Sequence, residues 1–178
     1  TSFAAPMVAG GIALMKDAAN SLLASEANAQ DTRVIKSVLM AGAAETNGWN
    51  NGQNAMNVTT QALDLKTGAG AMDLVASADV YYFGTTDVDG AGGGLIDVAG
   101  WDSGTISLGT FTDYIFATEF AQEMALTVAL NWFAGRSFNG ITDTATDDSF
   151  ANLDLQVWSV DGNGQFVSKV GESMSTYN

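Results

Sequence analysis

The sequence predicts two helices that end an α/β unit, followed by an antiparallel β-sandwich. Two observations support this fold class. Apolar residues recur every three to four positions before residue 45, and every second position in segments after Asp79. Residues 1–78 hold six acidic and four basic residues, whereas residues 79–178 hold fourteen and two. Together these changes predict a boundary near residue 80, with residues 1–80 and 81–178 as separate domains.

The first predicted helix covers residues 3–24 and is apolar on nearly every side. It opens with "TSFAAPMVAGG" (1–11), in which Ser2 is a favourable N-cap residue. Pro6 forfeits no hydrogen bond, because amides of the first turn have no partner within a helix. Gly10 and Gly11 permit a neighbouring element to approach closely. We therefore expect a buried helix capped by Ser2.

The second predicted helix follows Asp31 or Thr32, either of which can cap it. Its apolar positions share one helical face: Val34, Ile35, Val38, Leu39 and Ala43. Residues 45–62, rich in Asn, Gly and Thr, predict a surface loop. Residues 67–78 predict a glycine turn that leads into a short helical segment.

Strands are expected after Asp79, where turns rich in Gly and Asp separate short apolar segments. The candidates are residues 114–118, 125–133, 152–158 and 165–170. Of these, 125–133 and 152–158 show a clear alternation of apolar and polar residues. Residues 84–104 form a glycine-rich connector. Short strands with such turns are typical of an antiparallel sandwich.

The composition excludes several kinds of chemistry. The chain has neither cysteine nor histidine, so it can form no disulfide and offers no imidazole as a general base or zinc ligand. Its net charge of −14 repels phosphate backbones, and we expect no nucleic-acid partner. The longest apolar stretch, Phe3 to Met15, is shorter than the roughly 20 residues that span a bilayer, so we expect no membrane segment.

The opening segment resembles the region around the nucleophilic serine of the subtilisin-like serine proteases. The matching residues are Thr1, Ser2, Ala4, Pro6, Val8, Ala9 and Gly10. Met7 stands where the family commonly has His, at a position outside the catalytic triad. Two later segments, "VIKSVLMAGAAET" (34–46) and "GAGAMDLVAS" (68–77), are similar to the next helix and to the glycine turn that closes the family's catalytic domain. All three occur in the family's order.

The resemblance implies that Ser2 attacks the scissile carbonyl of a protein or peptide substrate, and that its backbone N–H contributes to the oxyanion hole. A serine hydroxyl is a weak nucleophile without an adjacent base. The family's His base, its orienting Asp and its oxyanion-hole Asn all precede the serine segment, and none of their motifs is present here. We therefore expect the C-terminal part of a serine endopeptidase, which needs its upstream part and is inactive alone.

The second half resembles another domain found in the same family. "LTVALNWF" (126–133) and "NLDLQVW" (152–158) are similar to strands of the jelly-roll β-sandwich that follows the catalytic domain in some secreted subtilases. "SMSTYN" (173–178) is similar to the segment before a further strand. The resemblance implies a secreted, extracellular protein whose sandwich is incomplete here. Because open sheet edges invite pairing, and the first helix would lack its sheet partners, we expect an exposed helix and self-association.

Calcium is a candidate structural cofactor, because related jelly rolls carry it. The candidate ligands are Asp143, Asp147, Asp148 and Asp154. A second acidic group, Asp87 and Asp89, does not match the EF-hand pattern. The alternative for all these carboxylates is that they are solvated acids in turns.

An alternative function is that of a non-catalytic binding or interaction module. In that case the sandwich is the working part and Ser2 is a vestigial helix cap. The two functions differ in what precedes the chain. An Asp-Ser/Thr-Gly segment and a His-Gly-Thr segment upstream indicate the enzyme, and their absence indicates the binding module.

Overall fold

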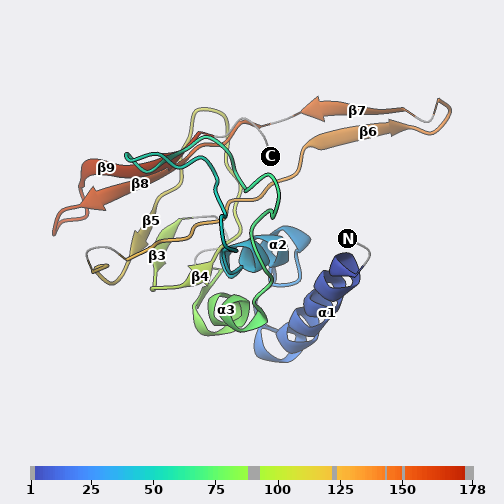
Figure 1. Ribbon diagram of the computed structural model, residues 1–178, viewed down its shortest axis with the longest axis horizontal. Coiled ribbons are helices and arrows are strands. Elements are labelled where there is room, and N and C mark those ends of the chain that lie inside the picture. Colours follow the sequence, from blue (N-terminus) through green and yellow to red (C-terminus); the bar gives the residue numbers. More distant parts are fainter. Residues whose placement is uncertain (1–2, 88–92, 122–123, 143, 150, 175–178) are drawn as a thin grey trace. The chain divides into compact units, whose positions relative to one another are not determined.

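A computed structural model describes residues 3–87, 93–121, 124–142, 144–149 and 151–174, with the side chains of 147–149 left aside (Figure 1). It is a mixed α/β structure with three α-helices and several small sheets. Contacts divide it into a first unit, residues 1–46 and 69–129, and a second unit, residues 47–68 and 130–178. The domain boundary near residue 80 stays a prediction.

The first unit contains the helices and two pairs of parallel strands. Its helical elements are α1 (Ala4–Leu22), α2 (Thr32–Ala41), α3 (Leu74–Ala78) and the π-helix η1 (Asp79–Phe83). Its strand pairs are β2 (Thr85–Thr86) with β4 (Gly100–Trp101), and β3 (Gly94–Ile96) with β5 (Tyr114–Phe116). No helix among the described residues is long and apolar enough to cross a membrane.

Helix α2 forms as the sequence predicts. Asp31 is its N-cap, and the Asp31 side chain accepts a hydrogen bond of 2.7 Å from the amide of Arg33. Val34, Ile35 and Val38 lie on one face and are buried in the core of the first unit. The predicted short helix is also present as α3, where the Asp73 carboxylate accepts hydrogen bonds from two amides of the first turn.

Helix α1 differs from the prediction of a buried helix. Only a stripe formed by Gly11, Met15 and Ala19 is buried, whereas Phe3 is 85% and Leu14 65% exposed. The exposure expected for a helix without its sheet partners is thus confirmed, and the self-association that we expect from it stays a prediction. At the N-cap position stands Phe3, not Ser2, and Phe3 makes no side-chain capping bond.

Close approach to a neighbouring element occurs at Gly11. A Cβ atom there would come within 2.9 Å of the Met72 sulfur, whereas a Cβ at Gly10 would meet nothing within 4 Å. The missing side chain of Gly11 therefore lets residues 72–74 pack directly against α1.

The core of the first unit is completed by aromatic residues on η1 and β4. Tyr81 is fully buried and its ring centroid lies 5.9 Å from that of Trp101. The Trp101 indole donates a hydrogen bond of 3.0 Å to the Tyr81 carbonyl, which ties β4 to the π-helix. Tyr82 donates one of 2.6 Å to the carbonyl of Met15 on α1. Both polar tips are therefore satisfied inside an apolar core.

The second unit contains a three-stranded sheet and a separate hairpin, β6 (Gly135–Asn139) with β7 (Thr144–Ser149). In the sheet, β9 (Phe166–Ser173) lies between β1 (Val58–Thr59), which is parallel to it, and β8 (Leu155–Val160), which is antiparallel. The described strands form only these small sheets and those of the first unit. No sandwich, closed barrel or subtilisin-like fold is identified among them.

Three of the four predicted strands have a counterpart. Residues 114–118 contain β5, and residues 165–170 and 152–158 overlap β9 and β8. The prediction for 125–133 is wrong in this structure, because the described residues 124–134 form no strand. Alternation alone does not make a strand, which also needs a hydrogen-bonded neighbour. The apolar side chains of Leu126, Val128 and Leu130 are 37–43% exposed.

Candidate functional site

The described part of the nucleophile segment is the start of α1. Ser2 itself lies outside the described residues. The Phe3 carbonyl accepts a hydrogen bond of 3.2 Å from the amide of Met7, and Pro6 lies within the first turn without disturbing it. No acidic side chain occupies this turn. The positive end of the helix dipole is therefore not neutralised locally and favours negative charge next to it.

This chain offers no imidazole as a proton acceptor for a serine, because its sequence contains no histidine. Any base for a hydroxyl within this chain must therefore come from another group, such as a carboxylate. Exposed hydroxyl–carboxylate hydrogen bonds join Thr67 to Asp64 and Ser25 to Glu26. Two larger groupings are the β6–β7 hairpin in the second unit and the end of the β2–β4 pair in the first unit.

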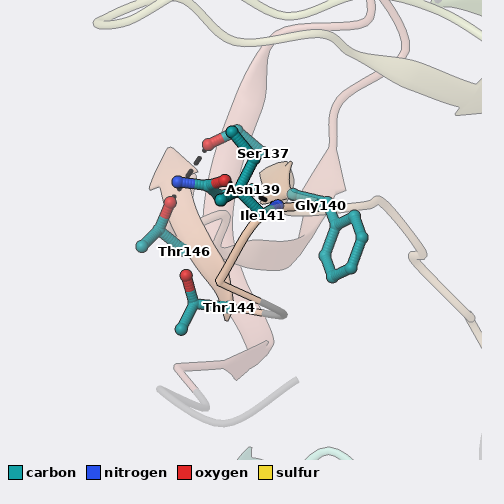
Figure 2. Close-up of a pocket in the computed structure, with 7 residues that line it drawn as sticks. Ser137, Asn139, Gly140, Ile141, Thr144 and Thr146 are labelled. Carbon is teal, nitrogen blue, oxygen red and sulfur yellow. Dashed lines mark hydrogen bonds between the residues drawn. The ribbon is translucent and has the colours of Figure 1, made fainter.

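The hairpin carries a hollow of about 590 Å³ near its turn (Figure 2). It is lined by Ser137, Phe138, Asn139, Gly140, Ile141, Thr144 and Thr146. The Ser137 and Thr146 hydroxyls lie 3.0 Å apart, on directly paired positions of the two strands. None of the residues that line the hollow is ionisable, so the lining itself supplies no base. The hollow suits a polar contact better than nucleophilic chemistry.

The second place is a carboxylate pair formed by Asp87 and Asp102. The amide of Asp87 donates a hydrogen bond of 3.0 Å to the Trp101 carbonyl, which extends the β2–β4 ladder by one step. The two aspartates directly follow the last paired residues of these strands, Thr86 and Trp101, and are therefore brought side by side. Asp87 has a φ of 45°, a left-handed conformation that Asp tolerates better than most residues.

One oxygen of each carboxylate has partners. Asp87 Oδ2 accepts a hydrogen bond of 2.9 Å from the Asn28 side-chain amide. Asp102 Oδ2 accepts 2.7 Å from the Tyr114 hydroxyl and 3.2 Å from the amide of Gly93. The other oxygens, Oδ1 of Asp87 and Oδ1 of Asp102, are shielded from solvent and have no hydrogen-bond partner within the described structure. Buried polar atoms of this kind require an explanation.

The electrostatics of this pair are unusual. Burial raises the pKa of Asp87, and the charge of Asp102 and a hydrogen bond with its carboxyl raise it further. The Asn28 hydrogen bond and the Ser103 backbone amide lower this pKa, and the net shift is upward. Burial and the hydrogen bond to Asp102 raise the pKa of Tyr114 to about 12, so its hydroxyl remains a donor at neutral pH. Of this group the sequence singled out only Asp87, paired with Asp89, which lies outside the described residues.

The calcium candidates are not brought together in the described structure. Asp143 and the side chains of Asp147 and Asp148 lie outside the described residues, and the side chain of Asp154 is exposed just before β8. Within the described residues no three acidic side chains gather as a metal site. Calcium binding by these four residues stays a prediction.

The described structure thus contains a partly buried carboxylate pair, a polar hollow on the β6–β7 hairpin and a first turn of α1 without acidic side chains. None of them combines a nucleophile with a base. Comparison with family models, curated proteins and solved structures finds no match to this chain.

Proposed function

We propose that this chain supplies the nucleophile segment of a secreted subtilisin-like serine endopeptidase. In this proposal Ser2 attacks the peptide carbonyl and its backbone N–H helps to stabilise the oxyanion. The His base and the Asp that orients it come from polypeptide that precedes these residues in the family's order. Residues beyond 80 form an incomplete jelly-roll sandwich, and the aspartates 143, 147, 148 and 154 hold a structural Ca²⁺.

The observation that carries the proposal is the position of the motif "TSFAAPMVAGG" at the start of a helix. One residue, Phe3, separates Ser2 from α1 in the sequence, and the first turn of α1 has no acidic side chain. A nucleophile at such a helix start benefits from amides that favour a developing negative charge. The following order of α1, α2, glycine turn and α3 agrees with the order of the three resembling segments.

A second observation supports the part of the proposal in which α1 packs against a segment outside these residues. Large apolar side chains on α1 are exposed, among them Met7 at 64% and Leu22 at 60%. Exposed apolar surface of this extent on one helix is typical of a face that packs against another element. In a subtilisin-like protein that element would belong to the sheet of the catalytic domain.

The proposal is tested by labelling the full-length protein, upstream part included, with a serine-directed phosphonate. We expect one label on Ser2, no label after Ser2→Ala, and an unchanged label after Ser21→Ala, which removes an exposed hydroxyl further along the same helix. The chain of 178 residues alone should not be labelled, because it has no histidine to activate the serine.

Two results would contradict the proposal. One is an upstream sequence without any His able to serve as base. The other is an intact protein with a complete triad that the phosphonate does not label at Ser2. Either result would favour the binding module, in which the sandwich carries the function.

A further inference from the structure

At the end of the β2–β4 pair, two carboxylate oxygens lack a hydrogen-bond partner within the described structure. Asp87 Oδ1 and Asp102 Oδ1 are both shielded from solvent and both lack a hydrogen-bond donor among the described residues. An ionised carboxylate only accepts hydrogen bonds, so two ionised aspartates cannot satisfy each other. Two partly buried negative charges side by side also repel, and no basic side chain contributes to the environment of Asp87.

We propose that Asp87 and Asp102 share one proton between their Oδ1 atoms. The resulting hydrogen bond holds the ends of β2 and β4 together and is lost as the pH rises. One aspartate is then neutral and donates, and the other is ionised and accepts. This arrangement satisfies both orphan oxygens with a single proton. It is the arrangement seen when two carboxyl groups occupy one site and cannot both ionise.

The surrounding hydrogen bonds hold the pair in place. Asn28 fixes the outer oxygen of Asp87, and Tyr114 together with the Gly93 amide fixes that of Asp102. All three partners donate, so each directs its carboxylate without competing for the shared proton. Because Asn28 follows α1 and Tyr114 belongs to β5, the pair links β2 and β4 to two other parts of the first unit.

The direction of the pH effect follows from the titratable groups that face Asp87, namely Asp102 and Tyr114. Burial and then Asp102 raise the pKa of Asp87 in the folded state, and together they outweigh the lowering by Asn28 and the Ser103 amide. Tyr114, with a pKa of about 12, is neutral over the pH range of the test. A group whose pKa is raised by folding stabilises the fold below its unfolded pKa, about 3.9 for Asp. That stabilisation is lost as the pH rises through the folded pKa.

A proton fits this place better than a divalent cation. Calcium takes six to eight oxygen ligands, commonly including several carboxylates. Here the two free oxygens are the only unpartnered carboxylate atoms of the described group, and no third acidic side chain joins them in the described structure.

The test is urea unfolding of the whole chain, with EDTA present, between about pH 4 and about pH 7. We expect the wild-type midpoint to fall over this range. Asp87→Asn and Asp102→Asn each replace the shared proton with a permanent N–H donor, and Asn also tolerates the left-handed backbone of residue 87. Both variants should therefore lose this part of the pH dependence and have a midpoint at or above the wild type at about pH 7.

Two further variants make the test specific. The double variant Asp87→Asn/Asp102→Asn should be less stable than either single variant, because two amides that keep their outer hydrogen bonds face each other with N–H groups. The matched control is Asp17→Asn, which changes an exposed aspartate on α1 and should keep the wild-type pH dependence.

The proposal is overturned if either single variant keeps the full wild-type pH dependence, or if the double variant is as stable as the singles. It is also overturned if Ca²⁺ raises the midpoint of the wild type but not of the variants, since the pair would then hold a cation. Should the variants fail to fold, the carboxyl ¹³C signal of Asp87 in the wild type decides. A titration well above the ordinary Asp range supports the shared proton, and an ordinary titration refutes it.

Discussion

The hydroxyl of Tyr81 donates its hydrogen bond to the carbonyl oxygen of Ala29, although the two residues are 52 positions apart. Tyr81 lies on the π-helix η1, and Ala29 lies in the turn between α1 and α2. Both residues are buried. This one bond therefore connects the turn between α1 and α2 to the π-helix that precedes the strands of the first unit.

Removing this hydroxyl leaves a buried carbonyl without its partner. We expect Tyr81→Phe to lower the free energy of unfolding by about 1–3 kcal/mol. Tyr82→Phe is the matched control, because Tyr82 and its hydrogen bond to the Met15 carbonyl are only partly buried, so that water can replace the lost donor. Urea unfolding of both variants measures the difference. An equal loss for Tyr82→Phe would show that the burial of Ala29 is not what matters.

Alkaline pH probes the same tyrosine. Burial, followed by the neighbouring Tyr82, raises the pKa of Tyr81 to about 12. Because the folded pKa lies above that of free tyrosine, about 10, the stabilisation is complete below about pH 10 and is lost as the pH rises towards about 12. The unfolding midpoint of the wild type should fall in this range, and that of Tyr81→Phe should fall less. An identical fall would contradict the expectation.

Gly42 is a second position where one atom decides the packing. A Cβ atom on Gly42 would lie 2.6 Å from both the amide nitrogen and the Oγ of Ser77, which is fully buried. Gly42→Ala should therefore destabilise the first unit by about 1–3 kcal/mol through overpacking. Gly10→Ala is the control: it lies in α1 with open space around it, and should stabilise the helix by about 0.5–1 kcal/mol. Opposite signs in thermal unfolding are the expected result.

Acidic pH should destabilise the loop of the second unit that contains Asp64. The Asp64 carboxylate accepts hydrogen bonds from the amides of Thr67 and Lys66, and these bonds lower its pKa to about 2. Its contribution to stability is therefore present above the unfolded pKa of about 3.9 and is lost as the pH falls through about 2. Asp64→Ala should weaken the acid dependence of unfolding more than Asp17→Ala does, which removes an exposed carboxylate on α1. Equal effects would contradict this account.

The exposed face of α1 should cause association of the chain. We expect the mass measured by light scattering to rise with protein concentration, and the double change Met7→Gln/Leu14→Gln to reduce that rise. Both side chains are more than half exposed, so little packing is lost. Ala13→Gln is the control, since it adds a polar group on an exposed position without removing a large apolar one. A monodisperse wild-type monomer would contradict the prediction.

Local features of the fold could be predicted from the sequence, because their causes lie within a few residues. The cap at Asp31 and the spacing of Val34, Ile35 and Val38 are sufficient to define α2. The strand predicted at 125–133 failed for the opposite reason. Its alternation is real, but a strand depends on a partner that the sequence of the segment does not specify.

The same distinction applies to the candidate sites. Ser2 could be singled out because its motif is contiguous, yet the nucleophilic role proposed for it needs a base, and this sequence contains no histidine. The Asp87–Asp102 pair could not be predicted, since it follows from the register that places Thr86 opposite Trp101. Neither aspartate is marked by its neighbours in sequence, and Tyr114 joins them only through the folding of β5 beside β3.

The pairing of β1 with β9 has a consequence for how the second unit forms. Val58 lies opposite Glu172, so this short ladder closes a loop of more than one hundred residues. Closing a loop of that length costs conformational entropy, and the β1–β9 ladder has only two residue pairs to compensate for it. The β8–β9 hairpin can assemble locally and early, while β1 docks last. In hydrogen exchange, the amides that join residues 57–59 to β9 should open first.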